Sequence, residues 1–310
     1  MRIIRDYQFV DPDTRGASAA IGNFDGVHLG HQSVIDLARR AEPAAPLGVV
    51  TFEPHPRDYF APDASPFRLM SREARASRLE KLGVDQLYEL NFNAALAALT
   101  PEDFALKVIA DGFGLKHVIV GADFCFGKGR AGTAQHLRAF GKEMGFCVTI
   151  AELIAQSDKT ISSTAIRTAL SEGNPRLAAS MLGHWHRIEG PVIGGEQRGR
   201  ELGYPTANMS IDGLHPPAFG VYAVLVDVLE GPHEGSYQGV ASMGVRPMFG
   251  ENRPNLESFI FDFQGDLYGT PLSVALVEHL RPEAKFDGLD ALIKQMDADS
   301  AEARAILSAL

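Results

Sequence analysis

Short apolar runs alternate with amphipathic stretches along the first half of the chain. Runs of small and β-branched residues predict buried strands, and stretches with apolar residues three or four apart predict helices between them. The predicted strands are 17–21, 47–52, 87–92, 116–121 and 146–150; the predicted helices are 32–40, 71–82, a segment opening at Thr100-Pro101, and 133–145. This alternation predicts a Rossmann-like parallel sheet with helices on both faces. Ligands of such sheets bind beyond the carboxyl ends of the strands.

From about Trp185 the pattern changes to β-rich runs separated by Gly, Pro and Asn. The predicted strands are 221–229, 237–245, 256–263 and 272–280, a spacing typical of a small, mostly antiparallel barrel. A closing helix at 287–307 would bury the stripe Leu289, Leu292, Ile293 and Met296. Residues 170–183 are interpreted as a connector, because Gly173-Asn174-Pro175 breaks the periodicity. We therefore predict an α/β domain over residues 1–184 and a mostly β domain over residues 185–310.

Composition narrows the class of protein. The 310 residues are enough for two cores, and 45% hydrophobic with 22% charged residues is typical of a globular protein. A net charge of −10 argues against a nucleic-acid-binding surface. We find no signal-peptide core and no apolar run of membrane-spanning length. The two cysteines, Cys125 and Cys147, fit a reducing compartment. We therefore expect a cytoplasmic protein without nucleic-acid or membrane partners; oligomeric state is not predicted.

The stretch from Ile21 to Gln32 carries the strongest chemical signal. Gly22, Gly26 and Gly30 allow a sharp strand-to-helix turn whose free amide groups and helix dipole suit a phosphate. His28 and His31 are three residues apart and share one side of the first helical turn. Two imidazoles at that place can stabilise charge developing on phosphorus. A plain glycine-rich turn with surface histidines is the alternative; a zinc site is disfavoured because helical zinc pairs are usually spaced i, i+4.

The segment Gly22-Asn23-Phe24-Asp25-Gly26-Val27-His28-Leu29-Gly30-His31 resembles the His-x-Gly-His signature of the nucleotidylyltransferase superfamily. More narrowly, it resembles the amino-terminal module of the bacterial bifunctional riboflavin kinase/FMN adenylyltransferases (FAD synthetases). Three further stretches match the same family, namely Thr51 to Pro56, Gly121 to Arg130, and Ile161 to Arg167. Taken alone, the hydroxyls of the last stretch could equally be helix caps.

The resemblance implies roles for individual residues in adenylyl transfer from ATP to FMN. His28 and His31 would stabilise the α-phosphate. The turn and phosphate-binding residues would be Gly22, Asn23, Phe24, Asp25 and Gly26. The residues holding the ATP phosphates and pyrophosphate would be Ser162, Ser163, Thr164 and Arg167. Pro56, Asp123 and Phe126 would lie near FMN and the adenine.

Two features of the second half carry chemistry. The first is a glycine-rich loop at 194–204 followed by Pro205, Thr206 and Asn208. It is not a P-loop, because the Lys-Ser/Thr pair is missing, but in an extended chain Thr206 and Asn208 face the same side, as two oxygen ligands of a metal should. The second is Glu257, which would share a strand face with Phe259, Phe261 and Phe263. Such a carboxylate could act as a base, or it could be a solvated surface charge.

Together with the turn Gly244 to Pro247, these features resemble a riboflavin kinase module. The resemblance implies that Thr206 and Asn208 bind Mg²⁺ with the ATP phosphates, and that Glu257 takes the proton of the ribityl 5′-hydroxyl as it attacks the γ-phosphate. The other ATP- and flavin-binding residues would be Gly195, Arg200, Gly203, Pro205, Arg246, Arg281 and Phe286. Two positions depart from the family pattern: Met248 stands where Thr is usual, and Phe259 where His is usual.

The combined motifs predict a two-step enzyme that converts riboflavin and ATP to FMN, and FMN and ATP to FAD. One alternative is a nucleotidylyltransferase with another acceptor, such as a phosphopantetheine or a phosphorylated alcohol. A second alternative is a flavin-binding regulator that has lost catalysis. The substrates expected are ATP, riboflavin and FMN, with Mg²⁺ on the phosphates.

Overall fold

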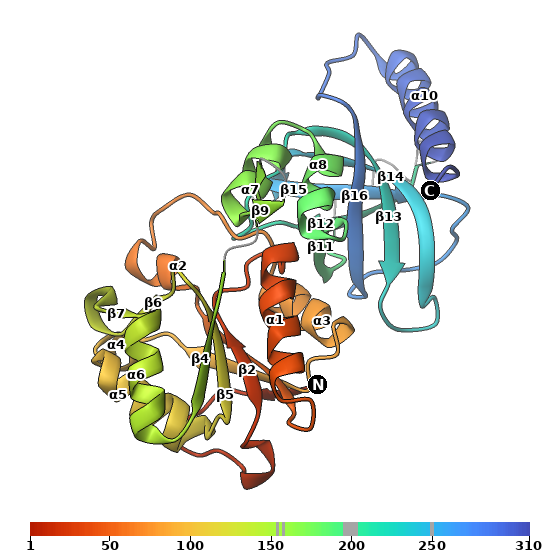
Figure 1. The fold of residues 1–310 in the computed structure, drawn as a ribbon. Helices are drawn as coiled ribbons and strands as arrows, with labels where there is room; N and C mark the ends of the chain where they lie inside the picture. The colour runs from red at the N-terminus through yellow and green to blue at the C-terminus, as the bar shows by residue number, and fades with distance from the viewer. Residues whose placement is uncertain (153–154, 157–158, 195–203, 249–250) are drawn as a thin grey trace. The chain divides into compact units, whose positions relative to one another are not determined.

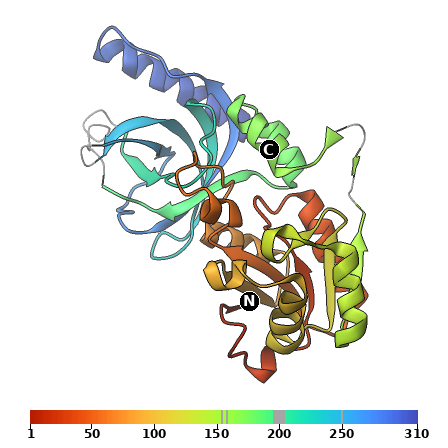
Figure 2. The ribbon, with the colours of Figure 1, turned by 90° about the vertical axis from the view of Figure 1, so that its left-hand side faces the viewer.

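The computed structural model describes residues 1–152, 155–156, 159–194, 204–248 and 251–310 (Figures 1 and 2). They form two compact units. The first comprises Met1–Ala64 and Arg75–Ile161, and the second comprises Ser65–Ala74 and Ser162–Leu310. Within the second unit, the Arg68 carbonyl accepts a 2.8 Å hydrogen bond from the His215 amide. A short segment of the first half thus belongs to the second unit. The domain boundary expected between residues 184 and 185 stays a prediction.

Six parallel strands form the sheet of the first unit. Their order across the sheet is β1 (Arg2–Ile4), β4 (Gln86–Asn91), β3 (Leu47–Glu53), β2 (Ser18–Ile21), β5 (His117–Gly121) and β8 (Cys147–Ala151). This confirms the predicted Rossmann-like sheet. The sequence pattern missed β1, because its three residues include one charge and are too few to show a periodicity.

Helices cover both faces of this sheet (Figure 1). The helical segments of the first half are α1 (Leu29–Ala41), α2 (Pro56–Phe60), α3 (Arg72–Lys81), α4 (Ala94–Ala97), α5 (Pro101–Phe104), the π-helical η2 (Ala105–Phe113), α6 (Ala134–Met144), and the short turns η1 (Pro12–Thr14) and η3 (Lys128–Arg130). Two hairpins join β6 (Cys125–Phe126) to β7 (Gly132–Thr133) and β9 (Ala155–Gln156) to β10 (Lys159–Thr160). The predicted caps form: Thr100 accepts from the Asp103 amide and Ser71 from the Ala74 amide.

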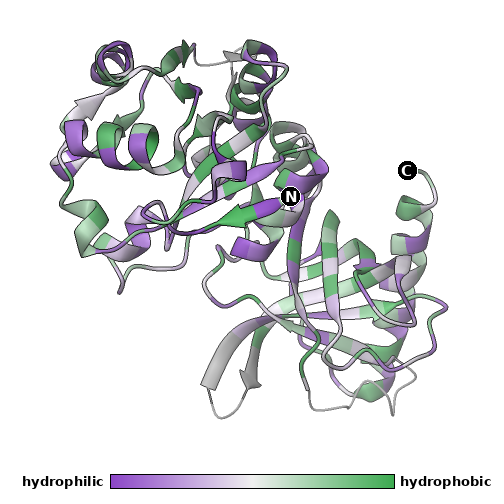
Figure 3. Ribbon diagram, turned by 90° about the horizontal axis from the view of Figure 1, so that it is seen from below, coloured by the Kyte–Doolittle hydropathy of each residue, from purple (hydrophilic) through white to green (hydrophobic). Residues whose placement is uncertain are grey.

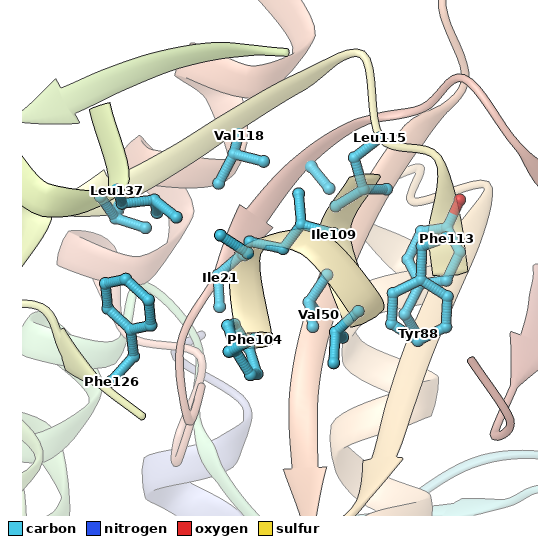
Figure 4. Close-up of a cluster of buried hydrophobic side chains, with 14 of the residues drawn as sticks. Ile21, Val50, Tyr88, Phe104, Ile109, Phe113, Leu115, Val118, Phe126 and Leu137 are labelled. Carbon is cyan, nitrogen blue, oxygen red and sulfur yellow. The ribbon is translucent and has the colours of Figure 1, made fainter. Parts of the chain in front are cut away.

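The core of the first unit lies between the sheet and the helix pair α5–η2. Figure 4 shows Ile21 and Val50 of the central strands facing Phe104 and Ile109 of that helical segment. These four side chains are nearly inaccessible to solvent. Burial of each such side chain stabilises the fold by about 1.5–3 kcal/mol. The core therefore fixes β2 and β3, the two strands whose carboxyl ends carry the histidine turn and the segment around Pro56.

Six antiparallel strands form the sheet of the second unit. Their order is β11 (His186–Pro191), β16 (Pro271–Arg281), β13 (Gly220–Val228), β14 (Gly235–Met248), β15 (Glu251–Ile260) and β12 (Thr206–Ser210). The two end strands approach each other: the Ile193 amide, just after β11, donates to the Asn208 carbonyl in β12 at 2.8 Å. This contact curls the sheet toward the predicted barrel (Figure 2).

In the described part of the second unit, three helices accompany the barrel, and one sequence interpretation of this region is wrong. Residues 170–183 are not a plain connector, because Asn174 caps a regular helix, α8 (Pro175–Leu182), which follows α7 (Ser163–Ser171). The closing helix α10 (Leu289–Leu307) forms as predicted but buries Asp299, Ala303 and Leu307, whereas Leu289 is 53% exposed. Leu292, Ile293 and Met296 are half-buried, and Leu292 and Met296 share the side of the helix that Asp299, Ala303 and Leu307 bury. Figure 3 shows that the helix leading to the C-terminus carries both apolar and polar residues.

The two faces of β15 serve different purposes. Leu256 and Ile260 point into the barrel, while Phe259 and Phe261 pack in a cluster with Ala303 and Leu307 of α10. Phe263 does not continue the outer row as predicted. Asp262 has a left-handed backbone conformation (φ 56°), which ends the strand's alternation, and Phe263 packs against the interior cluster. Glu257 therefore lies on the outer face of the barrel.

Candidate active sites

The histidine turn of the first unit is a strained connection between β2 and α1. Besides Gly26, two buried non-glycine residues, Phe24 and Val27, have positive φ values of 52° and 42°. Such a conformation is unfavourable, above all for a β-branched residue. The turn is held at both ends: Thr51 Oγ1 donates to the Asn23 carbonyl at 3.1 Å, and Gln32 Nε2 donates to the Val27 carbonyl at 2.8 Å. Strain maintained in this way is characteristic of functional sites.

The two histidines stack at the amino end of α1. Their ring centroids are 3.6 Å apart with 14° between planes, and the centroid of the Phe24 ring is 5.1 Å from that of His31. His28 is the N-cap of α1: its Nδ1 accepts a hydrogen bond from the His31 amide at 3.3 Å. Nδ1 is therefore unprotonated, and a neutral His28 ring carries its proton on Nε2 as a donor. The helix N-terminus adds a positive potential for an anion.

Burial keeps both imidazoles uncharged at neutral pH. It lowers the pKa of His28 to about 4, partly offset by a hydrogen bond of the ring with the backbone of His28 itself. Burial, and secondarily the neighbouring His28, hold the pKa of His31 well below its usual range. The Nδ1 atom of His31 has no hydrogen-bond partner among the described residues. The stack can thus donate hydrogen bonds to phosphate oxygens without placing two charges together.

The remaining predicted residues of the turn differ in exposure. Gly22 is half-buried, Asn23 is exposed and Asp25 is buried, and the Gly22 amide donates to the Val50 carbonyl at 3.1 Å. Ligands in this fold class bind at the carboxyl edge of the sheet. The exposed Asn23 lies at this edge, whereas the side chain of Asp25 is buried within the turn.

Aromatic side chains gather near Pro56, which opens α2. Phe60 is 69% exposed, and its ring is 5.1 Å from Tyr59 and 5.7 Å from Phe92 at the end of β4. The sequence analysis names only Pro56 of this cluster; the aromatic pair Tyr59-Phe60, three residues after it, is the signal that it misses. An exposed aromatic cluster at the ligand edge of a sheet suits a flat ring system.

The loop after β5 presents only part of what was predicted. Asp123 is exposed, with its carboxylate directly over Gly121. Phe126 is buried, and its ring stacks on Phe124 at 5.5 Å and contacts Phe104 at 5.6 Å. Phe126 is thus part of the core, and a direct contact with ligand stays a prediction.

The predicted phosphate-binding hydroxyls open α7 in the second unit. Ser162 is the N-cap and accepts from the Ala165 amide at 3.2 Å, so its hydroxyl does form the cap that was the alternative interpretation. Ser163 is half-buried and Thr164 is exposed. Arg167 donates to Thr164 Oγ1 and to the Phe67 carbonyl, both at 3.3 Å, and lies over the Phe67 ring. An oriented guanidinium beside a helix N-terminus can bind phosphate.

The second site is created by strand pairing. In the register of β12 with β15, Thr206 is opposite Phe259 and Asn208 is opposite Glu257. On its other side, Glu257 is opposite Ser242 of β14. Directly paired residues bring their Cβ atoms within about 5.5 Å. The predicted metal ligands and the predicted base thus lie on one face of adjoining strands.

The sequence reading missed Asn255, a buried side chain between these groups. Its Nδ2 is 3.4 Å from Glu257 Oε1 and 3.5 Å from Asn208 Oδ1. The strand alternation that linked Glu257 to Phe259 also includes position 255, two residues earlier. That signal was available but pointed only to a shared face.

Arg281 and Phe286 lie at the junction of β16 with α10. Arg281 forms a paired ion contact with the buried Asp299, at 3.0 Å and 2.7 Å, and lies over the Phe286 ring at 5.5 Å. Asp299 also accepts from Gln295 at 2.9 Å. The guanidinium is therefore held by α10, and a role of Arg281 and Phe286 in lining a pocket stays a prediction.

Several predicted positions cannot be placed in this geometry. Gly195, Arg200 and Gly203 lie outside the described residues, and for Arg246 and Met248 only the strand position in β14 is described. Pro205 is exposed just before β12. Phe259, the residue that departs from the family pattern, contacts Tyr204 with ring centroids 4.8 Å apart. Tyr204 in turn donates to Asp297 of α10. Phe259 thus anchors the segment that leads into Thr206.

Comparisons with known proteins agree with both sites. A family model for FAD synthetase matches residues 10–165, and one for riboflavin kinase matches residues 182–307. A bifunctional riboflavin kinase/FMN adenylyltransferase of Pseudomonas fluorescens is 41% identical, covering 99% of this chain and 98% of the relative. The corresponding Bacillus subtilis protein is 36% identical over 98% and 96%. A solved structure from Streptococcus pneumoniae, named as a macrolide-efflux protein, superposes with a TM-score of 0.83 at 32% identity over 98% of each chain.

The first unit has a parallel sheet with a histidine turn. The second has a barrel whose outer face carries Asn208 and Glu257, here called the carboxylate face. Together they define a two-module transferase acting on nucleotides. More specifically, the chain belongs to the family of bifunctional riboflavin kinases/FMN adenylyltransferases.

Proposed function

We propose that this chain makes FAD from riboflavin in two ATP-dependent steps, with FMN as the intermediate. The observation that best supports this proposal is that each family model covers one set of motif residues. The FAD synthetase model covers the histidine turn, and the riboflavin kinase model covers the strands of Asn208 and Glu257. The family is ATP-dependent, and ATP, riboflavin and FMN fit it as substrates. The alternative acceptors, a phosphopantetheine or a phosphorylated alcohol, do not explain a riboflavin kinase module.

In the kinase step, Glu257 would take the proton of the ribityl 5′-hydroxyl while that oxygen attacks the γ-phosphorus of ATP, and ADP would leave. Thr206 and Asn208 fit a Mg²⁺ ion, because they supply a hydroxyl and an amide oxygen from one strand face. The described residues hold no group of three or more His, Cys, Asp or Glu that could bind a metal. A magnesium ion held by few protein oxygens is usual when phosphates and water complete its shell, and it would neutralise charge on the phosphates.

In the adenylyl step, an FMN phosphate oxygen would attack the α-phosphorus of ATP and pyrophosphate would leave. The neutral His28 and His31 would donate hydrogen bonds as charge builds on that phosphorus. Ser163, Thr164 and Arg167 would bind the leaving phosphates. Asn23 and Asp123 would border the nucleotides, and the aromatic cluster of Tyr59, Phe60 and Phe92 would support the flavin ring.

We further propose a cytoplasmic location, where ATP is available to such an enzyme. Among the described residues, no helix has both the length and the apolar character needed to cross a bilayer.

Chromatographic separation of products after incubation with riboflavin, ATP and Mg²⁺ tests the proposal. FMN should appear first and FAD later. FAD formation from supplied FMN without turnover of riboflavin would exclude the kinase step, and would point to the departures at Met248 and Phe259. FMN without FAD would exclude the adenylyl step. Formation of neither product would overturn the proposal.

A further inference from the structure

A single amide nitrogen links the two polar groups of the second site. Asn255 precedes Glu257 by two residues in β15, so the two side chains leave the same face of the strand. Asn255 Nδ2 donates to Glu257 Oε1 at 3.4 Å and to Asn208 Oδ1 at 3.5 Å. An amide nitrogen has two hydrogens, so it can serve both acceptors at once. Asn255 therefore connects the strand of the proposed metal ligand with the proposed base.

The environment of Asn255 makes its side-chain amide unfavourable for the stability of the folded state. The side chain is only 2% exposed, and its Oδ1 accepts no hydrogen bond among the described residues. A buried acceptor without a partner destabilises the folded state, and native structures contain few of them. An apolar side chain of similar volume would avoid that cost. Packing alone therefore does not explain an amide at this position, whereas the two contacts of its nitrogen do.

We propose that Asn255 is a positioning residue of the kinase site. This inference rests on the proposed roles of Asn208 and Glu257. An asparagine amide can rotate by half a turn and exchange its oxygen for its NH₂ group at little cost in shape. The contact with Asn255 Nδ2 fixes which end of the Asn208 amide is the oxygen, and that oxygen keeps a second lone pair for a metal ion. Holding one oxygen of Glu257 likewise fixes the direction of the other toward its proton donor.

The geometry distinguishes positioning from a role in substrate binding. Asn255 is only 2% exposed, so we do not expect it to touch riboflavin. Its loss should therefore lower kcat and weaken the response to Mg²⁺, with little effect on KM for riboflavin. A merely structural residue would instead lower thermal stability, and any loss of activity would follow the unfolded fraction.

The test is Asn255→Leu in the full chain, measured by riboflavin phosphorylation with Mg²⁺ varied, together with the melting temperature. We expect kcat to fall about 10- to 100-fold, the range for losing hydrogen bonds to a charged group and a metal ligand. The Mg²⁺ concentration for half-maximal rate should rise about ten-fold. The melting temperature should stay constant or rise, because the unpartnered acceptor is gone. Asn255→Thr, whose hydroxyl has one hydrogen and can serve one acceptor at a time, should fall between wild type and Leu.

Ser258→Ala is the matched control: Ser258 is buried in the same strand on the opposite face, across from Ala207 and Ala241. It should leave kcat and the Mg²⁺ response unchanged. Wild-type kcat and Mg²⁺ response in Asn255→Leu would overturn the inference, as would a loss of kcat with an unchanged Mg²⁺ response or a lowered melting temperature. Retained kinase activity in Glu257→Gln would instead contradict the proposed role of the base, independently of Asn255.

Discussion

The histidine turn of the first unit and the carboxylate face of the second unit are assembled in different ways. His28 and His31 belong to one continuous segment, and their stacking follows from the start of α1 and the strained residues around Gly26. Asn208 and Glu257 are distant in sequence and meet only because β12 pairs with β15 in one register. A slip of one residue would turn Glu257 toward the barrel interior. The first site thus depends on local backbone geometry, and the second depends on the whole barrel.

The two sites also differ in the ionisable side chains that they bury. The first site buries two ionisable rings and keeps them neutral, with the pKa of His28 lowered to about 4 by burial. The second site keeps a half-buried carboxylate beside an amide donor. Neutral donors suit a site that stabilises developing negative charge, and a carboxylate held in a fixed orientation suits one that accepts a proton.

The largest expected effect separates the two sites outright. Glu257→Gln keeps the shape of the side chain but removes the proton acceptor, so FMN formation should fall about 10²- to 10⁴-fold. FAD formation from supplied FMN should be unchanged, because the histidine turn is untouched. Initial rates of both reactions, measured on one preparation by chromatography, test this. A parallel loss of both rates would contradict the assignment of two separate sites.

The reciprocal change is His28→Ala, which removes a hydrogen-bond donor and the cap of α1. FAD formation should fall about 10²- to 10³-fold, as for loss of a charge-stabilising donor. Riboflavin phosphorylation should be preserved. His28→Asn serves as the control, because asparagine retains the cap; it should recover stability without recovering adenylyl transfer. Full activity of the Asn variant would mean that His28 acts only as a cap.

The contrast between the sites also explains what sequence could reveal. The sharp turn and the shared side of His28 and His31 were predicted from glycine spacing and the i, i+3 separation, because both express local rules of chain geometry. The strands β2, β3, β4, β5 and β8 were also predicted from local pattern, because each is a short segment rich in apolar residues. In the second unit, the shared face of Thr206 and Asn208 also followed from strand alternation.

The features that could not be predicted from the sequence depend on strand pairing and on side-chain packing. The contact of Asn255 with Asn208 requires the register of two strands, and the closure at Ile193 requires the curvature of the whole sheet. The burial of Asp299 in α10 could not be predicted, because it depends on the ion pair with Arg281 of β16 and not on hydropathy. These features arise from long-range geometry and leave no periodic signal.

Acid should affect the stability of the second unit through a histidine outside either site. Burial, with smaller contributions from His184 and His215, lowers the pKa of His186 to about 3, whereas the unfolded chain has the usual value of 6.5. Between those values the unfolded state binds more protons, so stability falls as pH decreases from about 6.5 and is unaffected above it. The slope from this one group approaches about 1.4 kcal/mol per pH unit.

Fluorescence of Trp185, the single tryptophan, can follow urea unfolding next to His186 at pH 7.5, 6 and 5. His186→Gln should give a shallower dependence on pH than wild type, with His136→Gln, on the exposed side of α6 in the first unit, as the control. An unchanged slope in His186→Gln would show that other groups determine the acid sensitivity of this unit.

The smallest expected effect probes how closely the histidine turn is packed. A Cβ at Gly30 would lie 3.1 Å from His28 Cε1 and 3.2 Å from its Nδ1, closer than ordinary contact. Gly30→Ala should therefore displace the ring by a few tenths of an ångström while favouring the helix. An off-rotamer shift of this kind costs about 0.5–1.5 kcal/mol, so FAD formation should slow about 2- to 10-fold with kinase activity unchanged.

Gly145→Ala is the control, because a Cβ at Gly145 meets no neighbour but the backbone has a φ of 85°. This change should lower stability without slowing adenylyl transfer in the folded enzyme. If Gly30→Ala had no effect on FAD formation, the histidine turn would tolerate a displaced His28 ring. That result would contradict the conclusion that the first site depends on local backbone geometry.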